Sequence, residues 1–276
     1  MGFEKCPQEH AIYKKQSGKS LLIVGVYVDD LLVTGTNHKE VTIFKSQMMK
    51  EYEMSDLGLL SYYLGIEVEQ SEGSMTISQT SYAKRIIEAA GMGDCNAAMY
   101  PMEPKLKLTK DEDGESVNET QFRSLVGSLR YLLHTRPDLA FSVGVVSRFM
   151  QTPKVSHLKA LKQILRYVKG TLNYGLKYKK GGDGEVTGYS DSSHGKDVMD
   201  RRSNTGTVFY FSGNLITWLS QKQRTVTLSS CEAEFIAATT TAYQALWLRS
   251  LLADLTGMKP SKVKFYVDNE SAIALM

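Results

Sequence analysis

The sequence has little cysteine and no long apolar run. Its three cysteines, Cys6, Cys95 and Cys231, are far apart and form no CxxC pair, so neither a disulfide framework nor a zinc site is expected. The longest apolar stretch, residues 21–28, is far shorter than the roughly 20 residues that a membrane-crossing helix needs. The N-terminal residues also lack the apolar segment of a secretory signal. These absences predict an intracellular protein, in the cytoplasm or the nucleus, with no membrane partner.

The charge of the chain is unevenly distributed. The 276 residues carry a net charge of +3, yet residues 121–180 contain 12 Lys or Arg and a single acid, Asp138. Such a block suits a polyanionic partner, but it also fits a solvated basic face without any partner. Both interpretations remain open on charge alone. With 42% hydrophobic residues, the chain is long enough for two compact domains.

The first part of the chain alternates strands and helices. Residues 21–28 and 31–34 form a hairpin-like pair, and a helix with apolar residues at helical spacing follows over residues 38–52. A second hairpin is expected in LGIEVEQ-SEGS-SMTIS, followed by a helix that Gly91 ends. The pattern is typical of an α+β fold.

The middle part is expected to be helical and basic. After an extended connection at residues 96–116, three helical patterns follow, of which the last is SHLKALKQILRYVKG. In this helix Leu158, Leu161, Leu165 and Val168 form an apolar stripe. A second stripe lies about 100° around the axis. We propose this second stripe as a nucleic-acid contact, formed by Lys159, Lys162, Arg166 and Lys169.

The last part again contains strands, a long helix and a strand, after a plausible boundary at GGDGE, residues 181–185. The strands lie in EVTGYSD, TGTVFYFSG and NLITWLSQ, the helix begins near CEAEF, and the final strand is KVKFYVD. The sequence therefore predicts three domains, over residues 1–95, 96–180 and 181–276.

Carboxylates stand at the ends of several predicted elements. Asp29 and Asp30 follow an apolar strand, and no Lys or Arg lies between Lys19 and Lys39 to neutralise them. Asp191 and Asp268 each end a strand of the last part. The long helix between them offers two glutamates, Glu232 and Glu234.

The two glutamates differ in their available roles. Ser229 and Glu232 fit a Ser-x-x-Glu capping box, which gives Glu232 a structural role, so Glu234 is the preferred functional residue. A divalent cation is the usual reason for clustered carboxylates, and oxygen ligands without His or Cys favour Mg²⁺ or Mn²⁺. A single Asp at a strand end is more often an ordinary turn residue. Three acids in one strand-helix-strand frame predict a metal site.

The motifs resemble those of copia-type retrotransposon Pol polyproteins. YVDDLLVTG and EYEMSDLGLLSYYLGIEVEQ are similar to the C-terminal part of that family's reverse transcriptase palm, and RPDLAFSVGVVSRFM is similar to its connecting region. The segment from GYSDSSHG through CEAEFIAA to VKFYVDNESAIAL resembles the family's ribonuclease H domain. The resemblance covers essentially the whole chain. It implies a partial palm, a helical thumb or connection, and a C-terminally truncated ribonuclease H-like mixed sheet with helices, an α+β or α/β fold.

The resemblance also implies roles for individual residues. Asp29 matches the principal metal ligand of the palm, and Asp30 a supporting carboxylate; Asp191, Glu234 and Asp268 match three of four nuclease ligands. In the intact family each site holds two Mg²⁺ or Mn²⁺ ions. The implied partners are an RNA-DNA hybrid or primed template and the remaining polyprotein segments, and the implied compartment is a cytoplasmic virus-like particle or the nucleus. Candidates for contacting the hybrid, or else plain surface-loop residues, are Arg201, Arg202 and Asn204.

The chain also departs from the family pattern. Residues 1–28 contain no aspartate, although the palm needs one from an earlier strand, and the fourth nuclease acid is missing. Both sites are therefore expected to be incomplete, and polymerase activity is not expected from this chain alone. Three hypotheses remain: a partial polyprotein with polymerase and ribonuclease ancestry, a non-catalytic basic nucleic-acid-binding module, and a relic of a transposable element without a biochemical role.

Overall fold

The computed structural model describes residues 2–104, 106–195, 197–257 and 261–276. Within these residues the chain forms an α+β fold with three four-stranded sheets. The chain divides into two compact units, one formed by Met1–Leu59 with Ala242–Lys264 and the other by Leu60–Thr241 with Phe265–Met276. This division does not follow the three domains expected from the sequence, and those boundaries remain a prediction.

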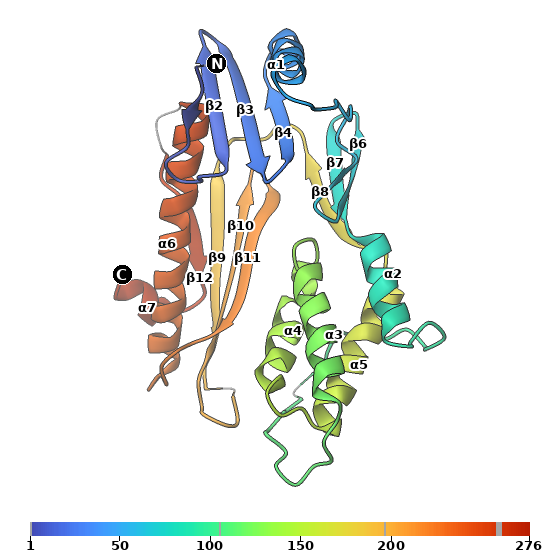
Figure 1. Ribbon diagram of the computed structural model, residues 1–276. Coiled ribbons are helices and arrows are strands. Elements are labelled where there is room, and N and C mark those ends of the chain that lie inside the picture. The colour runs from blue at the N-terminus through green and yellow to red at the C-terminus, as the bar shows by residue number, and fades with distance from the viewer. Residues whose placement is uncertain (1, 105, 196, 258–260) are drawn as a thin grey trace. The chain divides into compact units, whose positions relative to one another are not determined.

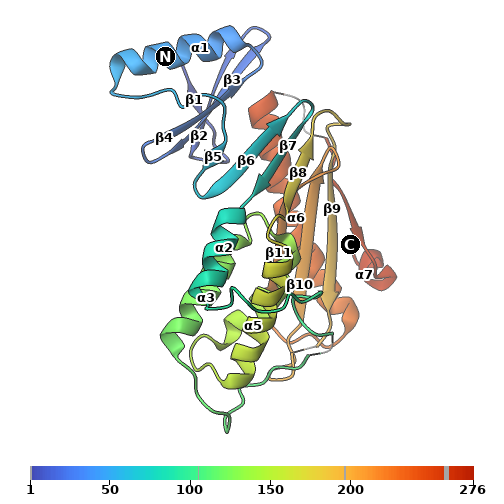
Figure 2. The ribbon, with the colours of Figure 1, turned by 90° about the vertical axis from the view of Figure 1, so that its right-hand side faces the viewer.

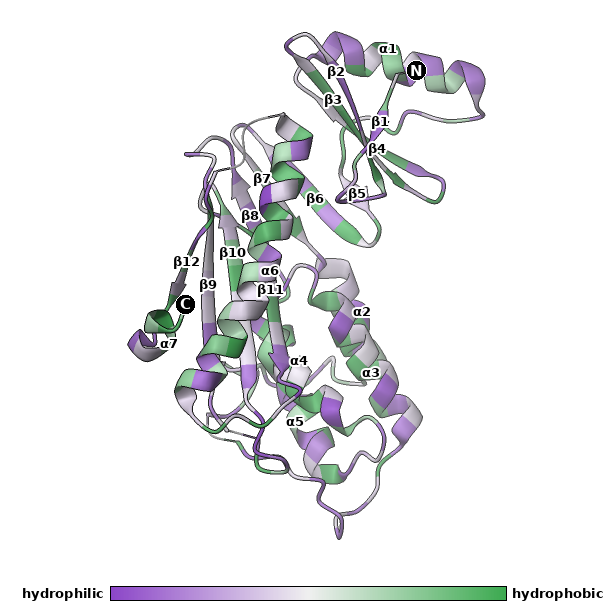
Figure 3. Ribbon diagram, turned by 90° about the vertical axis from the view of Figure 1, so that its left-hand side faces the viewer, coloured by the Kyte–Doolittle hydropathy of each residue, from purple (hydrophilic) through white to green (hydrophobic). Residues whose placement is uncertain are grey.

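The first sheet has the order β1-β2-β3-β4 and is antiparallel throughout (Figure 1). Its strands are β1 (Glu4–Lys5), β2 (Ile12–Ser17), β3 (Ser20–Tyr27) and β4 (Asp30–Gly35), followed by helix α1 (His38–Glu51). Leu22 and Val24, two residues apart on β3, are buried with Phe44 of α1. Helix α1 alternates hydrophilic and hydrophobic bands, as expected for a helix that packs on one side (Figure 3). The expected hairpin and helix are confirmed.

The C-terminal part of the long helix α6 (Ser230–Thr256) belongs to the same unit as this first sheet. Lys14 of β2 forms an ion pair with Asp254 at 2.9 Å. The Cys6 thiol is buried beside Asp254, and this burial, together with the hydrogen bond to Asp254, raises the pKa of the thiol. The three cysteines are all free thiols.

The second sheet joins segments that are far apart in the sequence. Its order is β5 (Tyr62–Tyr63), β6 (Ile66–Ser71), β7 (Ser74–Ser78) and β8 (Gly175–Lys179). The β6–β7 hairpin is confirmed. Strand β8, however, pairs antiparallel with β7, with Leu176 opposite Ile77, although the sequence predicted a helical region up to residue 180. Buried Leu176 alternates with exposed Lys177, which is the period of a strand.

A cluster of helices lies between β7 and β8 in the sequence (Figure 2). It contains α2 (Thr80–Ala89), α3 (Glu119–Leu132), the short turns η1 (Pro137–Leu139) and η2 (Ser147–Phe149), α4 (Ala140–Val146) and α5 (Val155–Gly170). The apolar stripe predicted for α5 faces the hydrophobic core, where Leu161, Leu165 and Val168 are fully buried. Gly91, with a φ of +64°, follows the end of α2 as predicted.

The third sheet carries the candidate site. Its order is β11 (Asn214–Lys222), β10 (Asn204–Phe211), β9 (Val186–Ser193) and β12 (Lys264–Val267), with α6 beside it and α7 (Glu270–Ala274) at the end of the chain (Figure 1). A Cβ atom at Gly188 of β9 would lie 2.5 Å from the ring of Phe209 on β10, so this position requires glycine. Among the residues that the structure describes, no helix is both long and apolar enough to cross a bilayer.

Candidate metal centre

Three acids reach the candidate site from three different elements. Asp191 lies on β9, two residues before the strand ends, and Asp268 directly follows β12. Glu234 lies near the start of α6. The side chains of the three acids therefore depend on the packing of α6 beside the strands rather than on any local turn.

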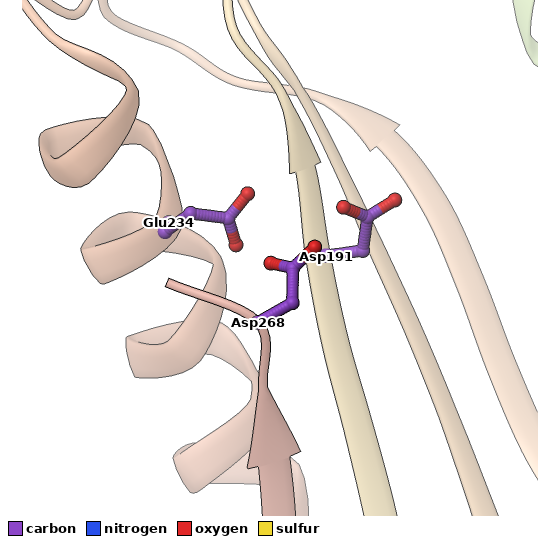
Figure 4. Close-up of side chains that lie close together, drawn as sticks. All are labelled: Asp191, Glu234 and Asp268. Atoms are coloured by element: carbon purple, nitrogen blue, oxygen red, sulfur yellow. The ribbon is translucent and has the colours of Figure 1, made fainter. Parts of the chain in front are cut away.

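The carboxylates converge. One carboxylate oxygen of each residue, Asp191, Glu234 and Asp268, lies within 4.8 Å of the others (Figure 4). Asp191 and Asp268 are exposed, whereas only 5% of Glu234 is accessible. The ion pairs found among the described residues involve other acids. The site is thus a concentration of negative charge.

Glu234 is held by one neighbouring residue. Its Oε1 accepts hydrogen bonds from the backbone N–H and the hydroxyl of Ser192, both at 2.9 Å. Its Oε2 is buried without a hydrogen-bond partner in the described part of the chain. Burial raises the pKa of Glu234, the hydrogen bonds from Ser192 oppose that rise, and the charges of Asp268 and Asp191 add to it. One oxygen is therefore oriented by the protein, and the other is available to a ligand.

This donor set fits a divalent cation. A buried carboxylate oxygen without a partner is costly, and a bound cation would remove that cost. The three residues offer only carboxylate oxygens, which suit Mg²⁺ or Mn²⁺ better than zinc.

Glu232 has the structural role expected from the sequence. Its backbone N–H donates to the Ser229 hydroxyl at 3.1 Å, and its Oε2 accepts from the backbone N–H of Leu228 at 2.7 Å. The side chain therefore caps α6 and turns back from the helix. Glu234, not Glu232, lies in the acid cluster.

Asp29 and Asp30 lie in a different environment. Tyr27 pairs with Asp30 across the β3–β4 hairpin, so Val28 and Asp29 form its two-residue loop, and both aspartates are exposed. Val28 has a φ of +50°, an unusual value for a β-branched residue. Within the described ranges, Asp29 and Asp30 belong to no group of three or more potential metal ligands. Their role at a metal site stays a prediction.

The basic residues of α5 have two different environments. Lys159 and Lys162 are exposed. Arg166 donates to the backbone oxygen of Asn96 at 2.8 Å, and Lys169 donates to the backbone oxygens of Gly93 and Cys95. The last two side chains thus hold the connecting segment, and Lys159 and Lys162 remain the exposed part of the predicted stripe.

The loop between β9 and β10 is organised around Asp197. Asp197 accepts from Arg148 at 2.7 Å and from Lys222 at 2.6 Å, and Arg148 also donates to Asn204. Of the predicted hybrid contacts on this loop, Arg202 lies 3.6 Å from Asp200, whereas Arg201 is exposed, with a φ of +58°. Asn204 therefore has an internal role, and Arg201 is the more accessible candidate.

Two residues beside Glu234 were not predicted. Ser192 orients the carboxylate of Glu234, but strand alternation places its side chain on the opposite side of β9 from that of Asp191, so spacing alone gives no sign of this contact. Gln223 is 5% exposed and donates from its side chain to the backbone oxygen of Ala233, one residue before Glu234. No sequence signal marks this glutamine.

Comparisons with known proteins define the class. The reverse transcriptase (RNA-dependent DNA polymerase) family model matches residues 1–104. The chain is 36% identical over 272 residues to the retrovirus-related Pol polyprotein from transposon TNT 1-94 of Nicotiana tabacum, a match that covers 95% of this chain and 20% of that protein. It is 34% identical over 275 residues to the Pol polyprotein from transposon RE1 of Arabidopsis thaliana, covering 100% of this chain and 19% of that one.

A shorter relative is matched over most of its length. The uncharacterized mitochondrial protein AtMg00810 of Arabidopsis thaliana is 36% identical over 222 residues, which are 80% of this chain and 92% of that protein. The chain belongs to the retrotransposon Pol polyprotein family, with a reverse transcriptase region at residues 1–104. It spans about a fifth of the length of the two polyproteins. The family in general uses divalent metal ions and binds a nucleic-acid template.

Proposed function

We propose that Asp191, Glu234 and Asp268 form a metal-dependent nuclease centre of the ribonuclease H type, which cleaves the RNA strand of an RNA-DNA hybrid. The observation that carries this proposal is the convergence of the three carboxylates within 4.8 Å around a buried Glu234. The order of strands and helix in the sequence and the resemblance of residues 188–275 to that nuclease support it.

The chain's own residues would act as follows. Asp191 and Asp268, exposed at neighbouring strands, present carboxylates to solvent, where a cation and a phosphodiester can approach. Ser192 fixes Glu234 through hydrogen bonds to Oε1. The other oxygen, Oε2, has no hydrogen-bond partner among the described residues. Asp191, Glu234 and Asp268 would hold divalent ions, which would supply activation of water and stabilisation of the leaving oxygen of a phosphodiester. The hybrid would be recognised by its backbone shape and 2′-hydroxyls rather than by its base edges.

The palm region is not proposed to polymerise DNA in this chain alone. Asp29 and Asp30 lie in an exposed hairpin turn, and residues 1–28 contain no aspartate that could complete a metal site with them. A primed template incubated with the protein, Mg²⁺ and nucleotides should show no extension. Any Mg²⁺-dependent incorporation that Asp29→Asn abolishes would contradict this statement.

The nuclease proposal is tested by hybrid cleavage with Mn²⁺ or Mg²⁺. The wild-type protein should cleave the RNA strand weakly, and Asp191→Asn should abolish that cleavage. Glu232→Gln is the matched control, because it removes a carboxylate from the same helix turn outside the cluster and should preserve cleavage. Cleavage that is unchanged in Asp191→Asn, or absent from the wild type at every metal concentration, would refute the proposal.

A further inference from the structure

Gln223 is a buried amide that directly follows β11. Its Nε2 donates two hydrogen bonds, one to the hydroxyl of Thr205 on β10 at 3.1 Å and one to the backbone oxygen of Ala233 on α6 at 2.9 Å. Its backbone N–H also donates to the backbone oxygen of Ser203 at 2.8 Å. The residue therefore joins two strands of the third sheet to the beginning of the helix.

The orientation of this amide is fixed by its partners. The Ala233 backbone oxygen can only accept, so the NH₂ group of Gln223, and not its oxygen, must face it. A backbone carbonyl has two lone pairs, so it can accept from Gln223 as well as from its own helix. The contact thus ties the helix backbone to the sheet one residue before Glu234.

Glu234 is consequently fixed at two points. Ser192 on β9 holds its carboxylate, and Gln223 holds the helix backbone beside it. The surroundings of Gln223 are closed to solvent, since Thr205 and Thr227 are each 4% exposed and Ser203 is fully buried. A change in the amide would shift the start of α6, and with it the distance of Glu234 from Asp191 and Asp268.

We propose that Gln223 is a positioning residue that sets the metal affinity of the acid cluster through the backbone of α6. The proposal rests on the nuclease centre proposed above, and it assigns Gln223 no contact with metal or substrate. Residues that orient metal ligands typically change metal affinity by about 10–100-fold when they are replaced.

The test compares two glutamines near the end of β11, Gln223 directly after the strand and Gln221 within it. Gln223→Glu keeps the shape of the side chain but turns a carboxylate oxygen toward the Ala233 carbonyl. Gln221→Glu introduces the same charge two residues earlier, at an exposed position. Mn²⁺ binding to the full chain is measured by electron paramagnetic resonance of the free ion, and hybrid cleavage provides kcat and KM for Mn²⁺.

We expect Gln223→Glu to weaken Mn²⁺ binding by about 10-fold or more, and Gln221→Glu to stay within about 2-fold of wild type. The Mn²⁺ concentration for half-maximal cleavage should rise with the dissociation constant, whereas kcat at saturating Mn²⁺ should change less. A merely structural role would not produce this separation. Equal Mn²⁺ affinity in the wild type and Gln223→Glu would overturn the proposal.

The failures of the two proposals are distinguishable. If the wild type shows no Mn²⁺ binding that Asp191→Asn removes, the nuclease centre itself is wrong. If wild-type binding is present and only the Gln223 effect is missing, the centre stands and the positioning role is wrong. Should Gln223→Glu unfold, Gln223→Met removes the donor without adding charge. If Gln223→Met also loses its fold in metal-free buffer, Gln223 is structural and the positioning role is rejected.

Discussion

Replacing Glu234 by Gln should stabilise the metal-free protein while removing its response to metal. Two unit charges 4.8 Å apart repel by about 0.9 kcal/mol in water and about 3.5 kcal/mol at an effective dielectric constant near 20. Because Asp191 and Asp268 are exposed, the lower value applies. Glu234→Gln relieves two such repulsions, so we expect a gain of about 2 kcal/mol, equivalent to a rise in Tm of about 4–8 °C.

The pH dependence of this gain has a definite sign. The pKa of Glu234 is raised in the folded protein, so the folded state keeps the proton to a higher pH than the unfolded chain. The stability that this proton gives is present below the ordinary glutamate pKa and is lost as pH rises through the folded value. The difference between Glu234→Gln and wild type should therefore be small near pH 4 and full at neutral pH.

Metal should reverse the order of stability. A cation at 100 times its dissociation constant would stabilise the wild type by about 2.7 kcal/mol, but Glu234→Gln would gain little. Thermal unfolding with chelator and with Mn²⁺ measures both effects, and Glu232→Gln controls for charge on the helix. If Glu234→Gln is no more stable than wild type in chelator at neutral pH, the carboxylates do not repel one another appreciably and the reasoning fails.

Three further predictions concern other parts of the chain. Burial raises the pKa of Asp197, but the hydrogen bonds from Lys222 and Met199 and the charge of Arg148 lower it more, so the net shift is downward. The stability that the ionised Asp197 contributes is therefore lost as pH falls through the folded pKa. Arg148→Met should cost about 1–3 kcal/mol and flatten this acid dependence in thermal unfolding. Val28→Gly should stabilise the protein by about 1 kcal/mol by relieving the positive φ, and an unchanged Tm would contradict this. Lys159→Glu with Lys162→Glu should reduce the slope of log affinity for a hybrid against log salt by about 2; an unaltered slope would mean a plain solvated face.

The fold was predictable where its signals are local. The β3–β4 hairpin, the β6–β7 hairpin and the α5 stripe each follow from spacing within about 20 residues, and all are present. Strand β8 was missed for two reasons. Its partner β7 lies about 100 residues earlier, and its five residues are too few to show a clear strand pattern directly after a predicted helix. Such a pairing depends on the tertiary fold.

The convergence of the three acids was predictable from the sequence, but the residues that hold them were not. Asp191 and Asp268 stand out because each lies at or near a strand end, and the capping role of Glu232 left Glu234 as the candidate. Gln223 gives no such sign, because its hydrogen bond depends on which backbone oxygen comes within reach once α6 packs beside the sheet. Hydrogen bonds between distant elements cannot be read from spacing.

Acids that converge in the fold are therefore stronger evidence for a metal site than acids that are only neighbours in the sequence. Asp29 and Asp30 are both exposed, so water screens their charges and the hairpin can tolerate them without any ligand. Glu234 is 5% exposed, and one of its oxygens is buried without a partner near two further carboxylates. A fold retains such an arrangement at a cost in stability, which a bound cation would offset. The burial of Glu234, more than the number of acids, is thus the physical reason to expect a metal here.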